Sequence, residues 1–165
     1  MTMFYLIRGW LSRINSALAY LGAALLLLMC LAVVSEIISR TVFSVSGLWV
    51  IETSEYALLY ITFLACPYLL EHKRHVMIDV LVNGLPPLAS HWVALIVAIG
   101  AGALCVLVAY AGALTSIDQY QMGFRESTTL APLSFWLTAI MPISLGLMAL
   151  QFGLQVVHNL QEMVD

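Results

Sequence analysis

The stretch from Leu48 to Leu81, LWVIETSEYALLYITFLACPYLLEHKRHVMIDVL, determines the class of fold. Its mostly apolar part, residues 49–70, is long enough at a helical rise of about 1.5 Å per residue to cross a hydrocarbon layer of roughly 30 Å. Two carboxylates, Glu52 and Glu55, stand near its beginning, and histidines with basic residues follow its end. The stretch therefore predicts a membrane-spanning helix with polar groups at both ends.

The composition of the whole chain agrees with a membrane protein. Of its 165 residues, 62% are hydrophobic and 9% are charged, whereas soluble domains have roughly 25% charged residues. Long unbroken apolar runs favour helices over a barrel, whose strands would alternate polar and apolar residues. The sequence predicts an all-α integral membrane protein that contacts membrane lipids. The net charge of −3, without a long run of Lys and Arg, argues against nucleic acid as a partner.

Four apolar runs are expected to be transmembrane helices within a single membrane domain of residues 1–165. They cover approximately residues 17–38, 49–70, 92–117 and 133–157. Residues 3–16 carry apolar side chains at helical spacing, with Arg8, Ser12 and Asn15 off this stripe. This pattern fits either an amphipathic helix at the interface or an extension of the first span into water.

The middle loop is expected to hold a second interfacial amphipathic helix. His75 and Asp79 recur at four-residue spacing on its polar stripe, and Pro86-Pro87 ends it. Upstream, Pro67 lacks the N–H that would reach the carbonyl of Phe63, which predicts a bend or an early end of the second span.

Small residues indicate how the helices associate. Ala94, Ala98 and Gly102 recur every four positions in the third span. A column of small side chains lets two helix backbones approach closely, so this helix should have a close neighbour. Before the fourth span, the run Ser127-Thr128-Thr129 can cap the next helix, with Pro132 in its first turn.

The distribution of basic residues predicts the orientation. With four spans both termini share a side, and that side together with the middle loop carries more Lys and Arg than the other. The residues are Arg8, Arg13, Lys73 and Arg74 against Arg40 and Arg125. Because basic residues favour cytoplasmic segments, the termini are expected in the cytoplasm.

In this orientation, polar and aromatic candidates gather at the outer face. They are Glu36, Arg40, Trp49, Glu52, Glu55, Arg125 and Glu126. Glu52 and Glu55 are three residues apart and could together bind a cation or relay protons, but their place at a helix N-terminus favours a structural or partner-facing role. Glu36 and Arg40 are four apart, which lets them pair across one helical turn.

The sequence predicts neither a metal centre nor a bound cofactor, and no catalytic residue. Each of the three cysteines lies in an apolar run, which argues against a disulfide framework and against closely spaced zinc ligands. His72, His75 and Asp79 could hold a metal from successive turns. Haem ligation would need imidazoles at membrane depth, whereas the histidines here lie in loops or at span ends.

A set of short motifs resembles one family of transporter subunits. The motifs are Leu48-Trp49 with Glu52 and Tyr56, Phe63-Leu64-Ala65, His75-Val76 with Asp79 and Leu81, Ser127-Thr128-Thr129-Leu130, and Trp136 with Met141-Pro142-Ile143. In order and spacing, over nearly the whole chain, the sequence resembles the small four-span membrane subunit of tripartite ATP-independent periplasmic (TRAP) transporters.

The resemblance implies a division of labour among three proteins of a bacterial inner-membrane system. A periplasmic binding protein captures an organic acid, a large permease subunit of the elevator type carries it inward with sodium, and the small subunit braces the large one. Sodium is then expected on the large subunit and not on this chain. The small subunit would also contribute to the docking face for the binding protein. As a hypothesis, Trp49 and Glu52 anchor the second span at the outer interface, while His75 and Asp79 orient the inner surface helix against lipid or the large subunit.

Two other classes of function stay open on the residues alone. One is an autonomous four-span carrier that uses Glu52 or Glu36 as a proton-coupled acid. The other is a haem- or quinone-bearing membrane anchor of a redox complex. None of the three classes makes this chain an enzyme in its own right.

Overall fold

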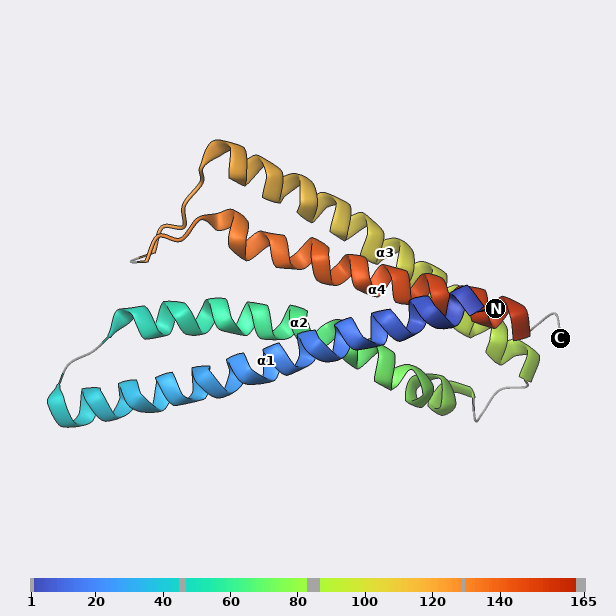
Figure 1. The fold of residues 1–165 in the computed structure, drawn as a ribbon, viewed down its shortest axis with the longest axis horizontal. Coiled ribbons are helices and arrows are strands. Elements are labelled where there is room, and N and C mark those ends of the chain that lie inside the picture. Colours follow the sequence, from blue (N-terminus) through green and yellow to red (C-terminus); the bar gives the residue numbers. More distant parts are fainter. Residues whose placement is uncertain (1, 45–46, 83–86, 129, 163–165) are drawn as a thin grey trace.

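The computed structural model consists of four long α-helices. They are α1 (Thr2–Phe43), α2 (Leu48–Val82), α3 (Pro87–Met122) and α4 (Ser134–Glu162). The structure describes residues 2–44, 47–82, 87–128 and 130–162, and of residues 2–7, 48, 73–82, 87–91, 94, 158 and 161–162 it describes the backbone alone. Successive helices run in opposite directions, so both termini lie at the same end of the molecule (Figure 1).

Three of the helices are long and apolar enough to cross a membrane, judged over the described residues. These parts are Arg8–Phe43 of α1, Leu95–Met122 of α3 and Ser134–Val157 of α4. The remaining helix, α2, is not among them, and it carries Glu52 and Glu55 in its first two turns. The all-helical class is confirmed, and the count of four spans stays a prediction.

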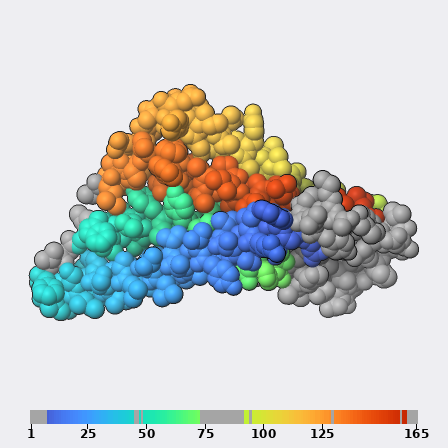
Figure 2. All heavy atoms as spheres, viewed as in Figure 1, coloured from blue at the N-terminus to red at the C-terminus, as the bar shows by residue number. Residues whose placement is uncertain are grey.

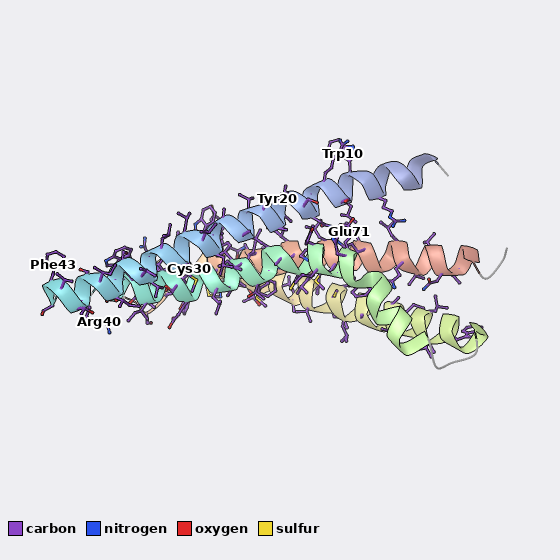
Figure 3. The ribbon with its side chains drawn as sticks, turned by 90° about the horizontal axis from the view of Figure 1, so that it is seen from below. Trp10, Tyr20, Cys30, Arg40, Phe43 and Glu71 are labelled. Atoms are coloured by element: carbon purple, nitrogen blue, oxygen red, sulfur yellow. The ribbon has the colours of Figure 1, made fainter. Side chains whose placement is uncertain are left out.

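The two expected amphipathic helices are not separate elements. Residues 3–16 form the first turns of α1, which is the second of the two alternatives for this segment. The predicted helix of the middle loop is the last part of α2, which continues through Pro67 to Val82, so an early end at Pro67 was wrong. Beyond Glu71 the axis of α2 turns away from its first part (Figure 3).

The four helices lie side by side in a single row. α1 packs on α2, α2 packs on α4, and α4 packs most extensively on α3, whereas α2 barely touches α3. The order across the row is therefore α1, α2, α4, α3 (Figure 1), and all four helices reach the face of the molecule in Figure 2. A single layer has no interior comparable to that of a globular domain, so most apolar side chains face outward.

Small residues of α3 mark the closest helix contact. Ala98 is 2% exposed, and a Cβ atom built on Gly102 would lie 3.2 Å from the Cβ of Phe152. One built on Gly112 would lie 3.4 Å from the Cδ of Pro142. The predicted close neighbour of this helix is confirmed, and it is α4.

Polar groups of α4 contact α2 at its proline. The hydroxyl of Ser144 donates to the carbonyl of Phe63, the group that Pro67 leaves without its helical N–H. Two turns later, Gln151 Nε2 donates to the carbonyl of Pro67 itself at 3.0 Å. These two bonds fix α2 against α4, and the first gives a donor to a carbonyl that would be costly to leave unpaired in an apolar environment.

Candidate interaction surface at the loop between α3 and α4

Three successive turns of α2 bind the segment that joins α3 to α4 and the first turn of α4. The backbone N–H of Leu130 donates to Glu52 Oε2 at 3.0 Å. One turn on, the hydroxyl of Tyr56 lies 2.8 Å from the hydroxyl of Thr128, and one turn further the hydroxyl of Tyr60 donates to the carbonyl of Trp136 at 2.6 Å. Because residues four apart lie on one helix face, a single face of α2 holds the loop in place.

The loop, residues 123–133, has a defined fold of its own. Arg125 and Leu133 form an isolated antiparallel bridge, the N–H of Glu126 donates to the carbonyl of Pro132 at 3.0 Å, and that of Ser134 to the carbonyl of Phe124 at 3.0 Å. Gly123 has a φ of +63°, a conformation that glycine adopts without strain. The loop is therefore a short hairpin-like structure, and α4 begins only after it, at Ser134.

The expected cap of α4 is wrong in its position. The hydroxyl of Thr128 contacts Tyr56 of α2, and Pro132 lies before the helix and not in its first turn. The N–H of Trp136 donates to the carbonyl of Leu133, which marks the start of the helical bonding. Within this run, Thr128 thus serves the contact between the loop and α2.

The predicted outer residues divide into two groups in the structure. Glu52, Arg125 and Glu126 each form a hydrogen bond with the loop backbone, and the bond of Arg125 runs from Nη1 to the carbonyl of Ala131 at 3.5 Å. Trp49 and Glu55 are both exposed, Trp49 with 55% of its surface. The indole of Trp49 folds back over Gly47, where a built Cβ would lie 2.8 Å from its Nε1.

Apolar side chains surround this loop and face outward. We use the name loop patch for Met122, Phe124, Leu130 and Trp136, which are 74%, 61%, 50% and 61% exposed. Large exposed apolar side chains beside polar ones are typical of surfaces that contact protein or lipid. The hydrogen bonds from α2 hold the backbone at two of these residues, Leu130 and Trp136.

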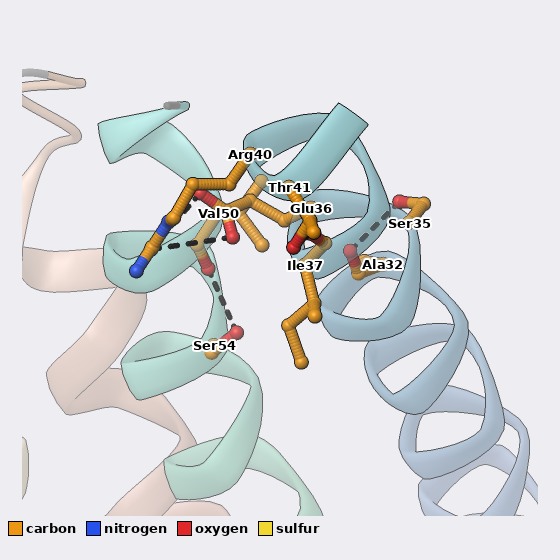
Figure 4. Close-up of polar contacts among 8 residues, drawn as sticks. All are labelled: Ala32, Ser35, Glu36, Ile37, Arg40, Thr41, Val50 and Ser54. Carbon is orange, nitrogen blue, oxygen red and sulfur yellow. Dashed lines mark hydrogen bonds and ion pairs between the residues drawn. The ribbon is translucent and has the colours of Figure 1, made fainter. Parts of the chain in front are cut away.

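The predicted pair Glu36 and Arg40 is confirmed on α1. Arg40 Nη2 lies 3.1 Å from Glu36 Oε1, and Glu36 is 8% exposed whereas the Arg40 side chain is 58% exposed. Both lie where α1 faces Val50 and Ser54 at the beginning of α2 (Figure 4). The buried carboxylate is thus neutralised within its own helix at the α1–α2 contact.

His75 and Asp79 belong to the turned last part of α2, and their side chains lie outside the described residues. Over the part that the structure describes, no group of three His, Cys, Asp or Glu side chains comes together in a way that could hold a metal ion.

A comparison with known families bears on these features as a whole. Residues 29–162 match the family described as tripartite ATP-independent periplasmic transporters, DctQ component. The chain belongs to the DctQ family. A comparison with curated proteins gives no match.

Membership of the DctQ family makes this chain a component of a TRAP transporter, a system whose name states that it has three parts. The family is one of transporter components and not of enzymes, and the three apolar helices make this member a multi-pass membrane protein. The match begins within α1 and ends at the last residue of α4, so it includes the whole surface described above.

Sequence reasoning missed several polar residues of this DctQ protein. Ser144 and Gln151 pair with α2, while Asn15, expected off the apolar stripe, is fully buried and donates to Glu71 Oε2 at 2.7 Å. One signal was present, because Ser144 and Gln151 are seven residues apart, two helical turns, in an otherwise apolar run. Polar residues at such spacing in a membrane helix often bind a neighbouring helix.

Proposed function

We propose that this chain is the small permease subunit that braces the large, sodium-coupled elevator subunit of a TRAP transporter in the bacterial inner membrane. It has four spans and cytoplasmic termini, and it supports the uptake of an organic acid that a periplasmic binding protein delivers. Sodium and substrate bind the large subunit and the binding protein. The turned end of α2, with His75 and Asp79, lies along the inner membrane surface against lipid or the large subunit.

The observation that carries this proposal is the low burial of the long helices. In the most apolar parts of α1, α3 and α4, 6%, 11% and 11% of the residues are buried inside the chain. A row of helices that hides so little of its apolar surface has two broad faces to offer. In a membrane, lipid can cover one face and a larger subunit the other.

The loop patch and its polar neighbours support a role in docking. Under the proposed orientation this patch faces the periplasm, where a binding protein arrives. Arg125 and Glu126 provide charges of both signs beside exposed aromatic rings, a composition that suits a transient protein contact. The hydrogen bonds from α2 prepare the surface before a partner binds, which lowers the entropy cost of association.

Copurification tests the assignment. The tagged chain is isolated from its native host without added partners, and the proteins that accompany it are identified by mass. We expect a large multi-span permease, together with a periplasmic binding protein under mild conditions. Transport by the purified chain alone in liposomes would indicate an autonomous carrier, and a haem absorbance band would indicate a redox anchor. Either result would contradict the proposal.

Variants of the outer residues test the docking surface. Glu52→Ala and Trp49→Ala should reduce solute uptake or recovery of the large subunit, because the first releases the loop and the second removes an exposed anchor. Thr53→Ala is the matched control, since Thr53 is exposed beside Glu52 and its hydroxyl donates to the carbonyl of Trp49 within its own helix. Wild-type levels of uptake and of recovered large subunit in both test variants would show that these two residues have no part in the docking surface.

A further inference from the structure

A second polar region lies where α1, α2 and α4 meet, toward the end of the row that carries the termini. A cavity of about 20 Å³ opens there between the three helices. Its lining residues are Arg8, Leu11, Leu70, Glu71, Gln151, Leu154 and Gln155. Although α1 packs mainly on α2, side chains of α1 and α4 both line this cavity.

One wall of the cavity is a buried amide whose oxygen has no donor. Gln151 is 8% exposed, and its Nε2 donates to the carbonyl of Pro67 at 3.0 Å. That bond fixes which end of the amide is which, because the reverse orientation would place two carbonyl oxygens together. Within the described part of the protein, Gln151 Oε1 has no hydrogen-bond partner.

A second buried amide, that of Asn15, lies on α1 one turn beyond Leu11, which lines the cavity. Asn15 is 0% exposed and donates through Nδ2 to Glu71 Oε2 at 2.7 Å, while its Oδ1 has no partner among the described residues. Glu71 itself lines the cavity. The junction therefore concentrates acceptor oxygens, and such groups are costly to bury without a donor.

We propose that this cavity is a binding site for one water molecule. The water donates to Gln151 Oε1 and to the Glu71 carboxylate, and it accepts from Arg8 or Gln155, the two other polar residues that line the cavity. A site for water needs roughly 10–15 Å³ and two to four polar partners, and both conditions are met. The volume is too small for a lipid headgroup, and the guanidinium of Arg8 opposes a cation. The water joins the α1–α2 hairpin to α4 and does not depend on the proposed function.

Transfer of magnetisation from water tests the site directly. The full-length chain, purified with its bound subunits and placed in lipid bilayers, is labelled with ¹⁵N-glutamine for solid-state NMR. The side-chain amide of Gln151, identified by its loss in Gln151→Met, should receive water magnetisation at short mixing times. Transfer as slow as that to the backbone amide of the buried Leu64, measured on a sample labelled with ¹⁵N-leucine, would overturn the proposal, and so would transfer that requires sodium.

Filling the cavity with a larger side chain gives a second test, because the Tm should fall if the cavity holds water and should stay the same or rise if it is dry. Leu154→Phe displaces the water and leaves Gln151 Oε1 without a donor, so the Tm should fall by roughly 2–4 °C relative to Leu150→Phe. Leu150 is the matched control because it is 61% exposed on the same helix. An unchanged or raised Tm would mean a dry cavity that the ring fills.

A further background separates loss of water from overpacking. The Gln151→Met variant has no side-chain oxygen that could be left without a donor. In that background Leu154→Phe should therefore no longer lower the Tm. A penalty of the same size in both backgrounds would show that the ring simply does not fit, and the water would then have no part in the effect.

Discussion

A side chain of α4 supplies the hydrogen bond that Pro67 costs α2. A proline within a helix leaves the carbonyl four residues earlier without a donor, and lipid offers no water to replace it. Here the hydroxyl of Ser144 donates to that carbonyl, of Phe63, and Gln151 donates to the carbonyl of Pro67. The helix is therefore able to continue past the proline while its axis turns beyond Glu71 (Figure 3).

A double-mutant cycle tests this replacement. Ser144→Ala should lower the free energy of unfolding by about 0.6–1.7 kcal/mol, the range measured for hydrogen bonds between membrane helices. In a Pro67→Ala background the helix regains its own N–H to Phe63, and the same Ser144→Ala change should cost less. The measurement is reversible unfolding of the purified protein in both backgrounds.

Ser116→Ala is the control for that cycle. The hydroxyl of Ser116 donates to the carbonyl of Gly112 in its own helix, so its removal breaks no bond between helices. We expect a change within about 0.5 kcal/mol in either background. An equal cost of Ser144→Ala with and without Pro67 would contradict the explanation.

The carboxylate of Glu52 should govern exchange of one amide in the loop. Glu52→Leu removes the acceptor of the Leu130 N–H, and loss of a hydrogen bond to a charged group, worth about 1.5–3 kcal/mol, allows at least about tenfold faster exchange. Hydrogen–deuterium exchange of peptides covering Leu130 measures it. Glu52→Gln keeps an acceptor oxygen and should retain part of the protection, and Glu55→Leu should leave it unchanged.

Among the helix pairs, α3 and α4 make the tightest contact, and glycine makes it possible. At Gly102 the two helices approach so closely that a Cβ would already meet Phe152 at 3.2 Å, whereas at Gly100 nothing lies within 4 Å. Close approach increases van der Waals contact, which is a main source of helix association in lipid. The two glycines, two residues apart, therefore have different roles.

This difference predicts the effect of valine at each position. Gly102→Val should force α3 away from α4 and destabilise the protein by about 1–3 kcal/mol, because the branched side chain enters occupied space. Gly100→Val carries the same change in intrinsic helix propensity but should stay within about 0.5 kcal/mol of wild type. Thermal unfolding of the two variants side by side measures the contrast, and similar Tm values would refute it.

The molecule as a whole is a flat row of helices with polar contacts at both ends. Toward one end, α2 binds the loop before α4, and toward the other, Asn15, Glu71 and Gln151 join three helices. Between these ends, the long helices present their apolar side chains outward. This arrangement fits a subunit that is fixed in shape by its ends and covered along its length by lipid or protein.

The proposed orientation can be measured in cells. In a background without Cys30, Cys66 and Cys105, a cysteine at Phe124 should react with a membrane-impermeant maleimide added outside the inner membrane. A cysteine at Leu160 should react only after lysis. Both native side chains are exposed, with 61% and 48% of their surfaces. The reverse pattern would place the termini in the periplasm and contradict the orientation.

The sequence by itself determined the features that depend on local chemistry. The length of the apolar runs set the helical membrane class, the missing N–H of Pro67 identified the carbonyl of Phe63 as the group in need of a donor, and four-residue spacing placed Arg40 beside Glu36. The column of small residues around Gly102 predicted a closely packed neighbouring helix. Each of these follows from a few adjacent turns of one helix.

Only the tertiary structure decided which groups meet across the chain. Glu52 binds the N–H of Leu130, 78 residues away, and Gln151 reaches the carbonyl of Pro67, 84 residues away. Asn15 was expected off the buried stripe, yet it is enclosed because α1 brings it to Glu71. Such contacts depend on the order of helices in the row and on their relative heights, and no single helix encodes either of these.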